Sequence, residues 1–188
     1  SGALINQLGQ NSGSMFASFI TGLVIACYEG KLNVVEYLLN QDSIDVNKAC
    51  NDDGSTPLFI ASQKGHKEIV ELLLNVDNID VNKAWNDNGG TPLYTAIQNG
   101  HLEIARSLKS QGADINIQLT DGNKGATMLW AAACSGQFES IKLCIEWGLD
   151  ISKCSDDGRS PLEVAKDREH VQTAAYINSR IYKRKDQI

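Results

Sequence analysis

Apolar residues occur at helical spacing in short segments along this chain. In the segment that begins at Lys67, Ile69, Val70 and Leu73 recur at intervals that place them on one side of a helix. The other side is charged, as expected for a helix that buries a single face. The same arrangement returns 35 residues later with Ile104 and Leu108. The pattern therefore predicts short amphipathic helices that recur along the chain.

The turn residues around these helices recur with the same period. Gly54–Asn82 matches Gly89–Asn116: Thr56-Pro57-Leu58 falls on Thr91-Pro92-Leu93, Gly65-His66 on Gly100-His101, and Glu68-Ile69 on Glu103-Ile104. Weaker copies of the threonine motif are Thr21-Gly22-Leu23, Thr127-Met128-Leu129 and Ser160-Pro161-Leu162. Self-similarity at a fixed period indicates a repeat architecture. We expect five units, at about 14–47, 48–82, 83–116, 117–152 and 153–180, followed by a basic C-terminal tail at 180–188.

Each unit is predicted to contain two helices. Threonine is a favourable N-cap, and the proline after it suits the first helical position, as at Thr91-Pro92. A glycine such as Gly100 then ends the first helix in a left-handed conformation. The last unit lacks the Gly-His pair between its helices. Since short helices are marginal alone, units must stack to form a core, and we predict an all-α solenoid.

The T-P-L motif, the G-H pair, the E-I-V-x-L-L-L helix and the closing D-V-N resemble ankyrin repeats. The resemblance extends from Thr21 to Ile177. It implies L-shaped units with hairpin-like loops at right angles to the helices, and a concave face that binds other proteins. It also makes Asn47, Asn82 and Asn116 candidates for hydroxylation, because they match a hairpin asparagine that an asparaginyl hydroxylase modifies in the family. The main role implied for these asparagines is hydrogen bonding across the loop.

Composition limits the function classes. The chain is 42% hydrophobic and 21% charged, which is ordinary for a globular protein. Its net charge of −6 argues against nucleic acid as a partner, since phosphate binding needs a basic face. It has no apolar run long enough to insert into a membrane. Five cysteines without paired spacing are typical of free thiols in a reducing compartment, so we expect a cytoplasmic or nuclear protein.

No residues are arranged for catalysis. His66 and His101 occupy a repeat position, which favours a structural role, and His170 lies in the last unit. Nothing pairs a cysteine with a facing base, and no spacing suggests zinc. The glycines belong to turns instead of a phosphate-binding loop. We therefore predict no enzymatic activity, no metal and no cofactor.

A binding surface is expected where residues vary while the repeat frame stays constant. By the resemblance, the hairpin loops and the end of each first helix face the concave side. The partner-binding candidates are Tyr28, Glu29, Cys50, Asp52, Asp53, Gln63, Lys64, Trp85, Asp87, Asn88, Gln98, Asn99, Leu119, Asp121, Cys134, Asp156 and Asp157. Their carboxylates favour a partner with a basic surface, through steering. Trp85 is of the type enriched in binding hot spots. In the alternative interpretation, the carboxylates only solvate the loops and Trp85 packs on its neighbours.

These observations favour a monomeric, non-enzymatic scaffold or adaptor that binds a protein partner on its concave face. One alternative is a targeting or substrate-recognition segment of a larger multidomain enzyme or effector. The absent initiator methionine suggests an excised or recombinant fragment, and the opening Ser1-Gly2 resembles the scar of a cleaved tag. A second alternative is a structural spacer or self-associating array.

Overall fold

The computed structural model describes residues 22–41, 44–50, 54–85 and 88–185. These residues form ten α-helices and no strand, with one isolated β-bridge between Gln118 and Thr127. The helices are α2 (Gly22–Tyr28), α3 (Leu32–Leu39), α4 (Pro57–Lys64), α5 (Lys67–Leu74), α6 (Pro92–Asn99), α7 (Leu102–Ser110), α8 (Met128–Cys134), α9 (Phe138–Glu146), α10 (Pro161–Asp167) and α11 (Val171–Lys185). The predicted all-α fold is confirmed.

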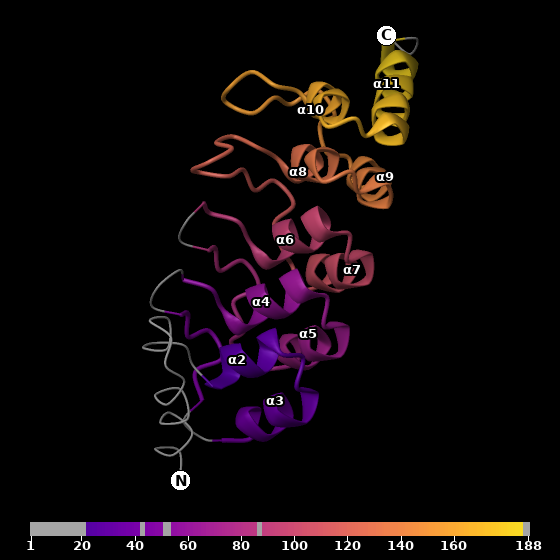
Figure 1. The fold of residues 1–188 in the computed structure, drawn as a ribbon. Coiled ribbons are helices and arrows are strands. Elements are labelled where there is room, and N and C mark those ends of the chain that lie inside the picture. Colours follow the sequence, from indigo (N-terminus) through magenta and orange to yellow (C-terminus); the bar gives the residue numbers. More distant parts are fainter. Residues whose placement is uncertain (1–21, 42–43, 51–53, 86–87, 186–188) are drawn as a thin grey trace.

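The helices form five stacked pairs (Figure 1). In Figure 1 the first helix of each pair lies on the loop side of the second helix, and the described parts of the hairpin loops project to the same side. We call the surface formed by these loops and the first helices α2, α4, α6, α8 and α10 the inner face. It corresponds to the concave face expected from the sequence. None of the ten helices is long and apolar enough to cross a membrane.

Four of the first helices, α4, α6, α8 and α10, begin at the threonine or serine of the motif, whereas Thr21 before α2 lies outside the described residues. Thr56 Oγ accepts a hydrogen bond from the backbone N–H of Phe59 at 3.1 Å, and Thr91 Oγ accepts one from Tyr94 at 3.3 Å. Ser160 forms a reciprocal capping box with Glu163. These bonds satisfy backbone donors that the first turn of a helix leaves open. The threonine or serine before each of these four helices therefore fixes where the helix starts.

Replacing Thr91 by alanine should lower the free energy of unfolding by about 1 kcal/mol, because the cap bond to Tyr94 is lost. Chemical denaturation measures the change. Thr120→Ala is the control, since Thr120 is exposed and lies outside any helix. Equal losses in the two variants would mean that the cap is not what stabilises α6.

The core runs through the stack between the two helix layers. First helices are buried almost all round, with Leu58 and Leu93 inaccessible to solvent, whereas second helices bury one face, as at Leu73 and Leu108. The repeated aromatic position, occupied by Phe59, Tyr94 and Trp130, is also buried. These three rings therefore belong to the core and are not accessible to a ligand.

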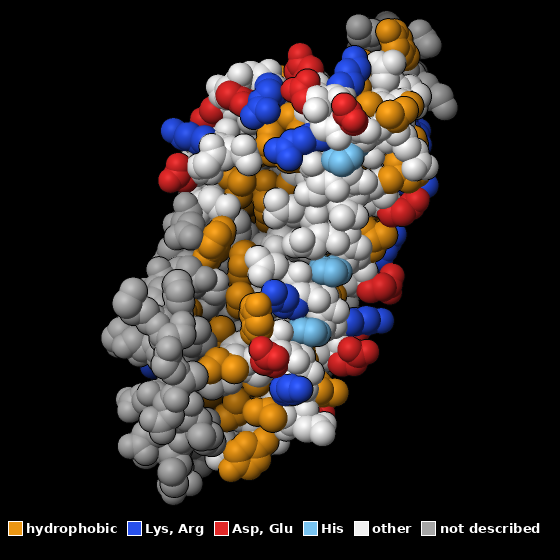
Figure 2. Space-filling model, in the orientation of Figure 1, with side chains coloured by type: hydrophobic (Ala, Val, Ile, Leu, Met, Phe, Trp, Pro, Cys, Tyr) orange, Lys and Arg blue, Asp and Glu red, His pale blue; other side chains and the backbone are white. Residues whose placement is uncertain are grey.

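The three histidines tie adjacent units together. His66 Nε2 lies 3.3 Å from the carbonyl oxygen of Tyr28, His101 Nε2 3.1 Å from that of Gln63, and His170 Nε2 3.1 Å from that of Cys134. A carbonyl can only accept, so Nε2 donates in each case. Figure 2 shows the three rings in one column along the molecule. These contacts give the histidines the structural role that the sequence favoured.

The last unit retains this contact without a glycine. Glu169 takes the left-handed conformation there, with φ of 61°, and His170 follows it. The turn between the two helices of the last unit therefore forms although the Gly-His motif is missing. The unit boundary predicted at residue 180 also differs from the structure, because α11 continues to Lys185. Residues 180–185 are the end of a helix, not a tail.

Two hairpin asparagines join neighbouring units, as the resemblance implied. The amide of Asn47 donates to the carbonyl of Asn78 at 2.7 Å and accepts from the N–H of Asp80 at 2.8 Å. Asn82 makes the same pair of bonds with Gly112 and Asp114, at 3.3 and 2.8 Å. The sequence has no glycine in the turn directly after α3 or α5, and in the turn after α5 Asn78 takes the left-handed conformation instead, with φ of 65°.

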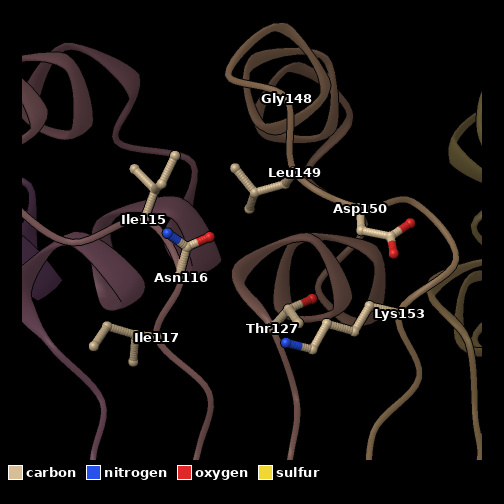
Figure 3. A pocket seen from close by; sticks show the side chains of 8 residues that line it. All are labelled: Ile115, Asn116, Ile117, Thr127, Gly148, Leu149, Asp150 and Lys153. Carbon is tan, nitrogen blue, oxygen red and sulfur yellow. The ribbon is translucent and has the colours of Figure 1, made fainter.

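Asn116 lies at the corresponding position but makes no such bonds within the described chain. The connections that would meet there are separated by a pocket of about 300 Å³, lined by Ile115, Asn116, Ile117, Thr127, Gly148, Leu149, Asp150 and Lys153 (Figure 3). The hairpin before α8 is also longer than the others. The third and fourth units are therefore joined differently from those before them.

This difference gives a paired prediction. Asn82→Ala should lower the free energy of unfolding by about 1–3 kcal/mol, because two inter-unit hydrogen bonds are lost. Asn116→Ala should change it by less than about 0.5 kcal/mol, because the exposed Asn116 side chain forms no hydrogen bond with the described residues, and the Asn116 N–H bond to Asp114 is kept. Urea denaturation of the two variants provides the measurement. A larger loss in Asn116→Ala would contradict this account of the junction.

Candidate functional site

A pocket of about 440 Å³ opens on the inner face between the first and second units. It is lined by Val24, Ile25, Tyr28, Glu29, Cys50, Ser55, Ile60 and Gln63. Four of the residues predicted to bind a partner therefore meet at one place: Tyr28, Glu29, Cys50 and Gln63. Tyr28 ends α2 and Glu29 follows it, whereas Cys50 lies in the hairpin loop and Gln63 in α4, so the pocket exists only because two units stack.

The residues that line this pocket are largely hydrophobic, and two of them are exposed to solvent. Tyr28 is 51% exposed and Ile25 is 41% exposed, whereas Ile60, one repeat after Ile25, is only 8% exposed. The Lys64 ammonium lies 4.0 Å from the centroid of the Tyr28 ring, a cation–π contact between units. In Figure 2, hydrophobic side chains form a band along this side of the molecule. An exposed apolar cluster of this kind is typical of a binding surface.

The inner face continues over α6 with uncharged polar side chains. Gln98 occupies the same repeat position as Gln63, and both side chains are half-buried. Neither amide makes a hydrogen bond in the part of the chain that the structure describes. Asn99 differs, because its Nδ2 donates to the carbonyl of Thr95 at 2.8 Å. Two glutamine amides on adjacent helices are therefore available to a partner.

Two of the loop carboxylates are exposed but paired with cations. Asp156 lies 4.0 Å from the Lys124 ammonium, and Asp157 lies 2.6 Å from Arg159 Nε. A hydrogen bond from the Ser155 hydroxyl, with further bonds from Arg159, holds the pKa of Asp157 below its ordinary value.

Two other predicted loop residues form hydrogen bonds within their own loops. Asp121 accepts the N–H of Gly122 and Asn88 accepts that of Gly90, so both side chains shape their own loops. Asp52, Asp53 and Asp87 lie outside the described residues. Of the described loop carboxylates, Asp156 and Asp157 are paired with cations and so contribute little to the steering of a basic partner. Asp121 has no ion pair among the described residues and keeps its charge.

Trp85, and the residues at the same position in other repeats, pack against the protein interior. The Trp85 ring stacks on Phe59 of the preceding unit, with centroids 5.7 Å apart and planes 26° apart. Cys50 and Leu119 occupy the same hairpin position and are 7% and 6% exposed. Their backbone N–H groups close the hairpins, as that of Trp85 does by bonding to Gly90. This position therefore serves packing first, and only part of the Trp85 ring can reach a partner.

Two of the cysteines are buried, and their thiols are held protonated. Burial raises the pKa of the Cys27 and Cys144 thiols to about 12, so both stay protonated at neutral pH. Cys134 is half-buried at the end of α8, where its carbonyl accepts the bond from His170. In the described ranges, no group of three or more His, Cys, Asp or Glu side chains is placed to hold a metal ion.

The sequence did not reveal the apolar part of the site. Val24, Ile25 and Ile60 read as ordinary core residues of a helix, and Ile60 is indeed buried. Ile25 is exposed because fewer residues of the neighbouring units cover it. A single sequence does not show which residues of other units pack against a given position. The one available signal was the spacing of three residues between Ile25 and Tyr28, which places both on one side of α2.

Comparison with known families supports the stacked-unit description. The family described as Ankyrin repeats (3 copies) matches residues 23–118. A search of curated proteins gives no match. The matched segment covers just over half of the 188 residues and contains the first three helix pairs, α2 to α7. Beyond it, α8 to α11 continue the same stacking. The chain belongs to the ankyrin repeat family.

Proposed function

We propose that this chain is a scaffold or adaptor that binds a protein partner on its inner face. Ankyrin repeats are generally protein–protein interaction modules, and the family is typically non-enzymatic. The observation that carries the proposal is the pocket between α2 and α4, with Tyr28 and Ile25 exposed at its wall. Concave apolar sites with a few polar groups are where ligands bind most often.

On α5 and α7, in the middle of the stack, the outer surface is charged and offers less to a partner than the inner face. There Lys67 lies 3.7 Å from Glu71 and 4.0 Å from Glu103 of the next unit. Paired charges of this kind keep a surface solvated, and a partner would have to separate them from water. The contrast between the two sides favours the inner face.

A pull-down from a cell lysate tests this proposal by comparing the original chain with two matched variants. The inner variant, Tyr28→Ser with Gln63→Ala, should lose the partner that the original chain captures. The outer variant, Tyr182→Ser with Gln172→Ala, makes the same exchanges at exposed positions of α11 and should retain it. All three proteins should melt alike. Loss in the outer variant, or retention in both, would place the interface elsewhere.

Self-association is the second candidate, and one observation favours it. Val34 and Tyr37 on α3 are 47% and 57% exposed, although Ile69, one repeat after Val34, is 2% exposed. A second copy stacked on α3 would cover them. Light scattering tests this: a mass that rises with concentration in the original chain, and stays constant in Tyr37→Ser, would support self-association over the monomer that we expect.

A further inference from the structure

We infer that the partner segment is an extended, uncharged peptide. It inserts one large hydrophobic side chain between α2 and α4, and its backbone then crosses α4 and α6 in contact with Gln63 and Gln98. The inference rests on the proposed function, because it describes how a partner would occupy the same inner face. Three features of the described residues support it: the pocket, the glutamine pair and the distribution of charge.

The pocket provides the place for an anchor. Its volume of about 440 Å³ is larger than one aliphatic or aromatic side chain, and Val24, Ile25 and Ile60 form its apolar wall. The exposed ring of Tyr28 can lie against an inserted side chain without moving the core. A hydrophobic residue placed here leaves water and covers Ile25 as well. Buried aromatic or aliphatic anchors of this kind dominate the affinity of many interfaces.

The glutamine pair provides contacts to a peptide backbone. Each amide has two donors and an acceptor, and a peptide backbone offers the matching C=O and N–H groups. Packed helices lie about 8–10 Å apart, and an extended chain rises about 3.3 Å per residue. One step from Gln63 to Gln98 therefore corresponds to about three residues of an extended peptide. The repeat spacing thus suits an extended segment that runs along the stack.

The charge distribution indicates what the segment lacks. At the mouth of the pocket, Glu29 and Lys64 carry opposite charges. The next positions along the first helices are uncharged: Gln98, Asn99, Cys134 and Ser135. A charged peptide residue placed over them would lose water and gain no counter-ion, which is unfavourable. An uncharged segment is therefore the complementary partner, in contrast to the basic surface expected from the sequence.

Selection from a library of unconstrained peptides of about twelve residues, enough to span four units, tests the inference. Selected peptides should share one large hydrophobic residue and few charges. Their affinity should fall at least about tenfold in Ile25→Glu, and about threefold to tenfold in Gln63→Ala with Gln98→Ala. Gln172→Ala is the matched control and should not change it. Raising the salt concentration should change the affinity by less than about twofold.

The same peptide with methylated backbone nitrogens tests the glutamine contact without altering the protein, and should bind about threefold to tenfold more weakly. Peptides that bind Ile25→Glu as tightly as the original chain would overturn the inference, as would strong weakening by salt. If no peptide is selected although the inner face captures a protein partner, the inference fails and the proposed function stands. If neither peptides nor proteins bind there, both fail.

Discussion

Leu73→Ala should lower the free energy of unfolding by about 2–5 kcal/mol, the range found when a fully buried leucine is truncated. Leu73 is 0% exposed in α5, the second helix of the second unit. The removed atoms lose their burial, and a cavity remains because neighbouring helices cannot fully close over it. Chemical denaturation measures the effect as a lower midpoint.

The size of this effect depends on the position of Leu73 inside the stack, so an exposed aliphatic residue is the control. Val171 on α11 is 76% exposed, and Val171→Ala should change the free energy of unfolding by less than about 0.5 kcal/mol. If Leu73→Ala unfolds at the same denaturant concentration as the original chain, the core does not pass through this face of α5.

Gly65→Ala should lower the free energy of unfolding by about 2–4 kcal/mol, for two reasons that add. Gly65 ends α4 in the left-handed conformation, with φ of 80°, which costs other residues about 1–2 kcal/mol. A Cβ atom there would also lie 2.6 Å from Cε1 of His101, closer than the atoms can approach. The ring would have to move, and its bond to the carbonyl of Gln63 would be weakened. Denaturation midpoints again provide the measurement.

Gly112→Ala separates these two reasons. Gly112 has nearly the same backbone conformation, with φ of 86°, but a Cβ atom there would meet nothing within 4 Å. Gly112→Ala should therefore lower the free energy of unfolding only by the cost of the left-handed conformation, about 1–2 kcal/mol. Equal losses at Gly65 and Gly112 would show that the histidine contact between units adds no stability.

Much of the fold could be predicted from the sequence because the repeat imposes the same local chemistry several times. The threonine and proline of each motif specify where a first helix starts, and this was confirmed at Thr56 and Thr91. The break in the last unit could not be recognised, because Glu169 adopts a conformation that its residue type does not favour. Local signals of this kind are reliable only where the residue type itself favours the required conformation.

The candidate site was less predictable because it depends on contacts between units. Repeat position identified Tyr28 and Gln63 as lining residues, and the structure places both at the same pocket. It did not show that Lys64 would lie over Tyr28, or that Asp157 would pair with Arg159. Those contacts depend on side-chain directions and on the stacking of one unit upon the next.

Site-specific photo-cross-linking tests the central claim most directly. A photoreactive side chain would replace Gln98 on α6 in one protein and Arg106, an exposed residue of α7, in another. If the inner face binds the partner, the Gln98 position should cross-link to it and the Arg106 position should not. Cross-linking from Arg106 alone would contradict the account, because the partner would then lie on the second helices.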